Sequence, residues 1–158
     1  MQKFELDGME YFNTFGGNPV SCAAGLAVLD EIEGQKLGKN ADYVGKFIMK
    51  KMRQLMDDFP SDVGDVRGRG LLIGVELSEG GGAAGTFEAS WVCSRLKEKF
   101  RILSTIDGEF DNVIVVKPPL SFHIEEAMYF CSAFRSSIRE LRKLKACGKF
   151  EAMSRTPT

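Results

Sequence analysis

Two apolar runs joined by a glycine-containing turn constrain the fold of this chain more than any other feature. Residues Val63–Arg67 and Leu71–Leu77 have the composition of β-strands, and Gly68 and Gly70 lie between them. Glycine adopts positive φ angles without steric cost, so such a turn can reverse the chain within a few residues. The sequence therefore predicts a hairpin. Its second strand is apolar on both faces at its start, which predicts an inner position in the sheet.

Four helices are indicated by apolar residues that recur every three or four positions. The first begins at Asn18-Pro19, because asparagine can cap a helix and proline suits its first turn, and Gly34 and Gly38 are expected to interrupt it. The other three are expected at residues 37–59, 87–100 and 124–144.

Two further strands are expected at residues 101–105 and 113–117, on either side of Asp107-Gly108. The alternation of strand pairs with helices predicts an α/β fold of the α+β type. We expect a mainly antiparallel sheet of about four strands, covered on one face by the helices that begin near Phe87 and His123 and preceded by a long helix.

Charge and cysteine usage restrict the class of partner. The chain has 21 basic and 22 acidic residues and a formal net charge of −1, so electrostatics give no case for binding nucleic acid or an anionic membrane. It has no apolar stretch long enough to span a bilayer. The scattered residues Cys22, Cys93, Cys131 and Cys147 contain no CxxC pair. They are expected to be reduced thiols in an intracellular protein, and no metal site is predicted.

The segment from Asn13 to Pro19 is the most chemically suggestive part of the sequence. It places the hydroxyl of Thr14 and the glycines Gly16 and Gly17 immediately before the start of a helix. Helix N-termini attract anions because their first amides lack partners and carry the positive end of the helix dipole. From the residues alone, both a plain turn that starts a helix and a phosphate site are compatible with this pattern.

Other chemically active side chains have simpler interpretations. His123 is the only histidine, and its position favours a helix start over a catalytic triad. Asp62, Asp65 and Glu76 alternate along two paired strands, as expected for a solvated face. Lys117 stands directly before Pro118-Pro119 as a single charge without a recognisable partner.

Several segments together resemble class III aminotransferases of fold type I. These are Tyr11–Ala23, Asn40-Ala41 with Val44-Gly45, Gly64–Leu77 and Lys117–Leu120, which occur in the order and approximate spacing of that family. The resemblance covers about residues 9 to 145. Glu10–Gly17, together with Leu103–Thr105, Asp107-Gly108 and Asn112-Val113, resembles the alanine–glyoxylate aminotransferase 2-like branch, which includes phospho-lyases acting on phosphoethanolamine or 5-phosphohydroxylysine. Ile106 is an extra residue in the branch's Ser-Thr-Asp-Gly run, which helps to line the substrate region.

The resemblance implies a cofactor, a partner and site residues. The family uses pyridoxal 5′-phosphate and forms homodimers, in which the threonine matching Thr14 donates a hydrogen bond to the cofactor phosphate in the other subunit, with Asn13 adjacent. Substrates are small amines or amino acids. Several family members bind the substrate carboxylate through an arginine at the position of Val115, so that contact does not transfer to this chain.

The family's Schiff-base lysine lies upstream of the Thr-Phe-Gly-Gly segment, so no catalytic residue is assigned within the chain. Residues 1–18 are expected to be the end of a large domain, and residues 19–59 to form connecting helices. Residues 60–147 are expected to form a C-terminal small domain, and residues 148–158 a flexible tail. Two hypotheses follow: a C-terminal part of an aminotransferase or phospho-lyase, and a non-catalytic association module derived from one. The resemblance is also compatible with a mitochondrial location, although no targeting segment is visible.

Overall fold

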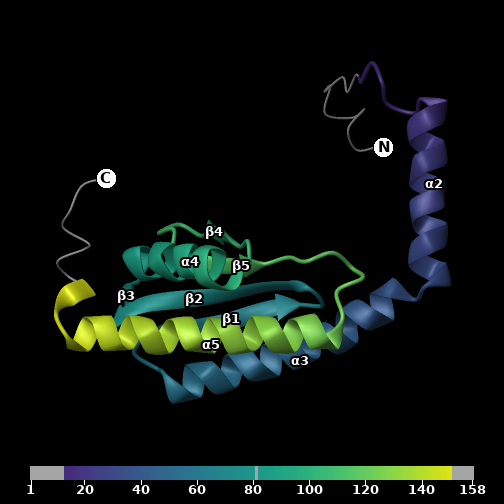
Figure 1. Cartoon of the computed structure of the whole chain (residues 1–158). Helices are drawn as coiled ribbons and strands as arrows, with labels where there is room; N and C mark the ends of the chain where they lie inside the picture. The colour runs from purple at the N-terminus through teal and green to yellow at the C-terminus, as the bar shows by residue number, and fades with distance from the viewer. Residues whose placement is uncertain (1–12, 81, 151–158) are drawn as a thin grey trace. The chain divides into compact units, whose positions relative to one another are not determined.

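The computed structural model describes residues 13–80 and 82–150, and the chain divides into two compact units, Met1–Lys36 and Leu37–Thr158. In the first unit, a turn at residues 14–17 leads into helix α2 (Pro19–Gly34). The second unit contains the sheet and the other long helices, α3 (Leu37–Asp58), α4 (Thr86–Phe100) and α5 (Ile124–Ala146) (Figure 1).

Helix α2 starts as the sequence predicts. Asn18 is its N-cap, Pro19 stands at its start, and the Asn18 side-chain oxygen accepts a hydrogen bond from the Ser21 amide at 3.0 Å. None of its residues is buried. The expected interruption at Gly38 is wrong, because α3 already begins at Leu37; the chain leaves the helical conformation at Lys36, whose φ is +54°.

The hairpin is confirmed. Strand β1 (Val63–Arg69) pairs antiparallel with β2 (Leu72–Gly80), and Gly68 and Gly70 take φ values of +147° and +56°. Two further strands, β4 (Thr105–Asp107) and β5 (Val113–Val116), complete the main sheet, and the short β3 (Ala83–Ala84) pairs with β2. The antiparallel sheet has the order β1-β2-β5-β4, so β2 is an inner strand as expected.

The strand expected at residues 101–105 lies further along the chain. Strand β4 covers Thr105–Asp107, because Arg101 ends α4 in the left-handed conformation at φ +58° and the chain then runs irregularly to residue 104. Ile106 pairs with Ile114 and packs against the core. It therefore contributes an inward-facing apolar side chain to the sheet.

One face of the sheet forms the core. Ile73, Val75 and Ile114 are almost fully buried, together with residues of α3, α4 and α5. The opposite face is polar at β1 and β2, where Arg67 Nη1 lies 2.7 Å from both Asp65 Oδ2 and Glu76 Oε2. Helices on one face and a solvated surface on the other confirm the predicted architecture, with α3 as an additional covering helix (Figure 1).

The region around the end of α5 departs from expectation. Asp62, expected on a solvated face, is buried, and its carboxylate lies 3.3 Å from Lys145 Nζ. Phe150 is also buried, with its ring centroid 5.0 Å from that of Phe87. Residues 151–158 of the expected flexible tail lie outside the described residues.

The four cysteines are free thiols. Cys22 and Cys147 are exposed, whereas Cys131 is buried, and burial raises the pKa of its thiol to about 12. Among the described residues, no helix is both long and apolar enough to cross a membrane.

Candidate functional site

The turn before α2 is folded by its own asparagines. The side-chain oxygen of Asn13 accepts hydrogen bonds from the amides of Phe15 and Gly16, each at 3.1 Å. The side-chain nitrogen of Asn18 donates to the Phe15 carbonyl at 2.6 Å. The two asparagines therefore hold the turn from opposite ends and leave Thr14 at its exposed tip.

The two glycines have separate roles in this turn. A Cβ atom at Gly16 would lie 3.2 Å from Cβ of Asn13, so glycine allows the asparagine to fold closely over the backbone. Gly17 has a φ of +75°, a conformation that side-chain-bearing residues rarely adopt. The pattern Gly16-Gly17 is thus explained by local geometry before any ligand is considered.

The turn retains donors that suit a phosphate group. Within residues 13–80 and 82–150, the Thr14 hydroxyl and the amides of Gly17 and Val20 donate to no acceptor. The Asn13 oxygen and the Asn18 cap already satisfy the amides of Phe15, Gly16 and Ser21. A hydroxyl and backbone amides beside the positive end of a helix fit a phosphate, so this donor set is compatible with the cofactor phosphate that the resemblance implies.

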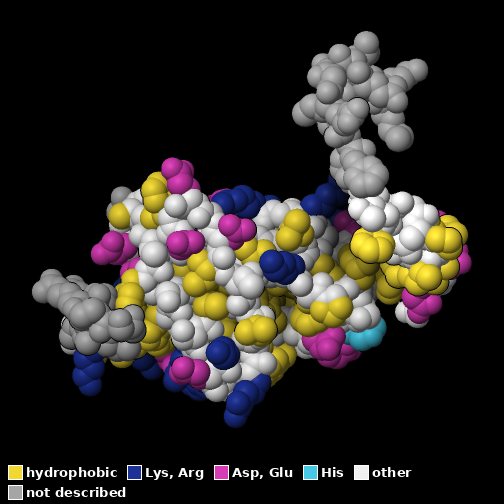
Figure 2. All heavy atoms as spheres, turned by 90° about the horizontal axis from the view of Figure 1, so that it is seen from above, with side chains coloured by type: hydrophobic (Ala, Val, Ile, Leu, Met, Phe, Trp, Pro, Cys, Tyr) yellow, Lys and Arg dark blue, Asp and Glu magenta, His cyan; other side chains and the backbone are white. Residues whose placement is uncertain are grey.

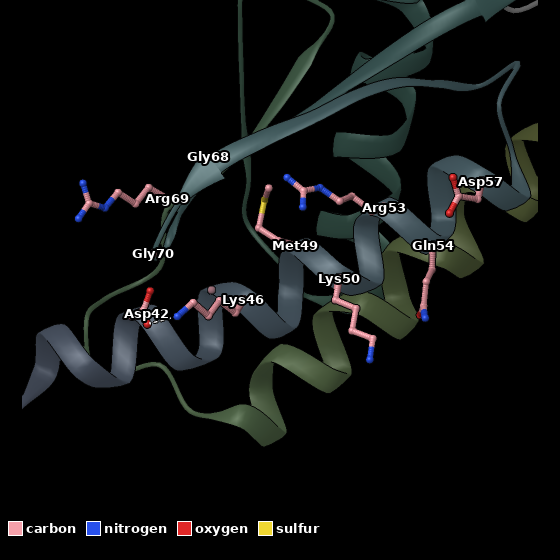
Figure 3. Close-up of a pocket in the computed structure, with 11 residues that line it drawn as sticks. Asp42, Lys46, Met49, Lys50, Arg53, Gln54, Asp57, Gly68, Arg69 and Gly70 are labelled. Carbon is pink, nitrogen blue, oxygen red and sulfur yellow. Dashed lines mark hydrogen bonds and ion pairs between the residues drawn. The ribbon is translucent and has the colours of Figure 1, made fainter.

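The second unit contains a basic groove between α3 and the β1–β2 turn (Figure 3). It has a volume of about 480 Å³. In Figure 3, Met49 and Arg53 point from α3 toward the strand end, Lys46 turns to Asp42, and Arg69 extends outward. The Lys46 ammonium lies 2.6 Å from Asp42 Oδ2. None of the sequence-predicted site residues lies in this groove.

A smaller pocket of about 290 Å³ lies beside β4 and β5. It is lined by the segment leading into β4, the end of β5 and the following proline segment, together with Phe122 and Phe130. Lys117 and Val115, both considered in the sequence, line it, and so does Thr105. The sequence does not predict this grouping, because it does not specify the register in which β4 pairs with β5.

His123 is the N-cap of α5, as predicted, and its amide donates to Glu126 Oε2 at 2.8 Å. In the described part of the chain, no group of three or more His, Cys, Asp or Glu side chains could hold a metal ion.

Comparison with known proteins identifies a family. The family model for class III aminotransferases matches residues 1–138. An alanine–glyoxylate aminotransferase 2-like protein of Drosophila melanogaster is 40% identical over 139 residues, which are 87% of this chain and 28% of that protein. The mitochondrial alanine–glyoxylate aminotransferase 2 homolog 2 of Arabidopsis thaliana is 41% identical over 138 residues, which are 86% of this chain and 28% of that protein.

A solved structure gives the same result. A phospholyase from Arthrobacter in complex with phosphoethanolamine matches with a TM-score of 0.77 and 34% identity, over 87% of this chain and 33% of that chain. The chain thus spans about a third or less of the length of these relatives.

Proposed function

The chain belongs to the class III aminotransferase family, whose enzymes depend on pyridoxal 5′-phosphate, and we propose that it forms the C-terminal part of such an enzyme. In this proposal the second unit is the small domain and the first unit supplies the turn that contacts the cofactor phosphate. The proposal rests on the turn itself, where the Thr14 hydroxyl has no acceptor within residues 13–80 and 82–150 and lies on a glycine-containing turn at the start of α2.

In this proposal, Thr14 and Asn13 have separate roles in binding the cofactor phosphate. The Thr14 hydroxyl would donate a hydrogen bond to a phosphate oxygen of the cofactor held by a partner subunit in a homodimer. Asn13 keeps its oxygen on the amides of Phe15 and Gly16, which leaves its side-chain nitrogen as an additional donor. When bound, the cofactor withdraws electrons from the α-carbon of an amine and so permits amino transfer or elimination.

We propose that the lysine that binds this cofactor covalently is not among the 158 residues of the chain. The family's lysine precedes the Thr-Phe-Gly-Gly segment, and in this sequence only residues 1–13 precede Thr14. The proposal is supported by the chain's coverage of only 28% of the Drosophila relative. Without that lysine, the chain contributes phosphate binding and the small domain, and the reaction needs the remaining part of an enzyme.

Two reactions fit the family, amino transfer from an amino acid and elimination of phosphate and ammonia from a phosphorylated amine. The match to the phosphoethanolamine-bound phospholyase favours the elimination. Val115 supports the same choice, because its side chain cannot pair with a substrate carboxylate. The mitochondrial name of the Arabidopsis relative supports a mitochondrial location for the complete enzyme.

A stand-alone association module is the second candidate function. This function is favoured by the exposed apolar residues of α2. Val20 is 79% exposed and Leu26 is 63% exposed. The two functions are separated by sequencing the transcript upstream of Met1. An in-frame large domain with a lysine supports the enzyme, and an in-frame stop codon supports the module.

Cofactor retention tests the role of Thr14 in the protein encoded by the complete reading frame. Thr14→Val removes the hydroxyl at similar volume, and we expect cofactor affinity to fall about tenfold, as for the loss of a hydrogen bond to a charged group. Thr14→Ser keeps the hydroxyl and serves as the control. Equal cofactor retention by wild type and Thr14→Val on dialysis would overturn the assignment.

A further inference from the structure

We propose that a pocket between α3 and α5 binds a small aliphatic carboxylate, with its carboxylate group at Lys51 and its hydrocarbon chain on the apolar side chains of both helices. The two helices lie next to each other on one face of the sheet (Figure 1). The pocket has a volume of about 270 Å³ and is lined by residues of the second unit alone. The inference goes beyond the proposed function and does not depend on it.

Small side chains on α5 leave room for this pocket. Cys131 and Ser132 line it from α5, whereas Met52 and Leu55 line it from α3. Met52 and Leu55 are almost fully buried, so the floor of the pocket is apolar. A pocket of this size lies at the small end of ligand sites and suits a chain of a few carbon atoms.

Lys51 brings a positive charge without an acidic partner to this pocket. Its Nζ lies 5.8 Å from the centroid of the Phe47 ring, which also lines the pocket. In the part of the chain that the structure describes, no carboxylate lies within 4.0 Å of this ammonium group. Burial raises the pKa of the Cys131 thiol to about 12, and the charge of Lys51 partly opposes that increase. The Lys51 charge therefore acts on the interior of the pocket.

Arg135, the second cation of the lining, already has a partner. Its Nη2 lies 2.5 Å from Asp58 Oδ2, so this ion pair joins α5 to α3 beside the pocket. Because Asp58 balances the charge of Arg135, we expect an incoming anion to pair with Lys51. The ion pair also holds the two helices together before a ligand arrives, and a preformed pocket loses less conformational entropy on binding.

The chemistry of the lining selects the class of ligand. None of the side chains that line the pocket is acidic, so an amine would meet positive charges without a compensating carboxylate. Apolar walls lower the local dielectric response, which strengthens the attraction between Lys51 and an anion. The side chains of Gln54 and Ser132 also line the pocket and can donate hydrogen bonds to carboxylate oxygens. An alcohol of the same length would keep the apolar contacts but lose the attraction to Lys51.

The test is an NMR titration of the whole chain, labelled at its methionine methyl groups, with hexanoate. Met52 and Met128 line the pocket, whereas Met49 lies in the basic groove between α3 and the β1–β2 turn. We expect saturable shifts of the Met52 and Met128 signals and little change at Met49. Hexanol, acetate and hexylammonium are the comparison compounds, and each should bind more weakly than hexanoate.

Substitutions separate the charge from the apolar wall. Lys51→Gln should weaken hexanoate binding about tenfold, and Lys51→Arg should stay within about threefold of wild type. Lys50→Gln is the matched control, since it removes the neighbouring exposed lysine of α3 that lines the basic groove, and it should bind as wild type does. Met128→Ala shortens a side chain that is 57% exposed, so we expect a folded protein with about threefold weaker binding.

Three results would overturn the proposal. The first is a titration in which hexanoate shifts neither Met52 nor Met128, or shifts Met49 equally. The second is equal affinity of Lys51→Gln and Lys50→Gln for hexanoate, and the third is equal affinity of the wild type for hexanol and hexanoate. The Thr14 assignment is unaffected by any of them, because it is measured by cofactor retention.

Discussion

Gly45 of α3 lies directly against Gly70 of the β1–β2 turn, so closely that a Cβ atom on Gly45 would lie 2.0 Å from the Gly70 carbonyl oxygen. The contact joins the first long helix of the second unit to the hairpin that organises its sheet. Gly70 itself needs glycine, because its φ is +56°. The two glycines thus set how closely helix and hairpin approach.

Gly45→Ala is therefore expected to be strongly destabilising. The added methyl group meets backbone atoms, which cannot rotate away, so we expect a loss of about 1–3 kcal/mol in the free energy of unfolding. Gly38→Ala is the matched control, since it lies in the same helix with no atom within 4 Å of its Cβ position. The control should be neutral or stabilising, by up to about 1 kcal/mol. Equal stabilities of the two variants in urea unfolding would show that the contact is unimportant.

Lys145 neutralises two buried carboxylates that come from different elements. Its Nζ lies 2.9 Å from Glu88 Oε1 and 3.3 Å from Asp62 Oδ1, and both acidic side chains are only 4% exposed. Lys145→Met leaves two buried acids without their cation, so we expect a loss of about 2–4 kcal/mol in unfolding free energy. Lys143→Met, an exposed position on the same helix, should change it by less than about 0.5 kcal/mol. Similar values for both variants would contradict this account of the cluster.

Glu140 gives the stability of the second unit a specific pH dependence. Its partial burial would raise the pKa of this carboxyl, but hydrogen bonds from Lys99 and Arg95 outweigh that effect, so the pKa is lowered overall. A depressed pKa in the folded state stabilises the protein above the unfolded-state pKa, and this stabilisation is lost as pH falls through the folded-state pKa. The pH range in which this stabilisation is lost therefore lies at and below the ordinary glutamate pKa of about 4.3.

Glu140→Gln should accordingly be less stable than wild type at neutral pH, and the difference should shrink as the solution is acidified through that window. Urea unfolding measured across the pH range provides the test, with Glu98→Gln on α4 as an exposed control. A difference between wild type and Glu140→Gln that stays constant with pH would refute the assignment.

Helix α2 should make the chain self-associate. Val20 and Val28 are 79% and 57% exposed, and hydrophobic side chains are visible over α2 in Figure 2. Burying apolar surface gains about 25 cal/mol per Å², so even a modest patch favours association. We expect light scattering to show a mass that rises with concentration, and the double variant Val20→Lys, Val28→Lys to be a monomer. Glu33→Lys, which adds charge without removing apolar surface, should associate like wild type. A strictly monomeric wild-type chain at high concentration would contradict the prediction.

The sequence predicted features that depend on local periodicity. The buried stripe of α3, the Asn18 cap and the hairpin at Gly68 all follow from residues close to one another in the chain. Strand β4 begins later than the sequence predicts, because Arg101 adopts a left-handed conformation that is usually indicated by glycine or asparagine. An arginine at that position gives no such indication.

The contacts between distant segments could not be predicted in this way. The Asn40 side chain donates hydrogen bonds to the backbone carbonyls of Leu120 and Phe122. Every residue has such a carbonyl, so the sequence does not indicate which ones accept a hydrogen bond from a distant side chain. The burial of Asp62 cannot be predicted from its neighbours in the sequence, because its partner Lys145 lies 83 residues away on another element. The Thr14 turn can be predicted because its hydroxyl and its glycines lie within four residues of one another. The structure adds which backbone amides already donate to its two asparagines.

We propose that this chain contributes phosphate contacts and a small domain to a pyridoxal-phosphate enzyme, while the lysine that binds the cofactor lies outside its 158 residues. The purified chain can be incubated with pyridoxal phosphate and reduced with borohydride, and the modified lysines can then be mapped by mass spectrometry. We expect sparse modification spread over several exposed lysines, with no transaminase or phosphate-eliminating turnover. Stoichiometric labelling of one unique lysine would contradict the claim.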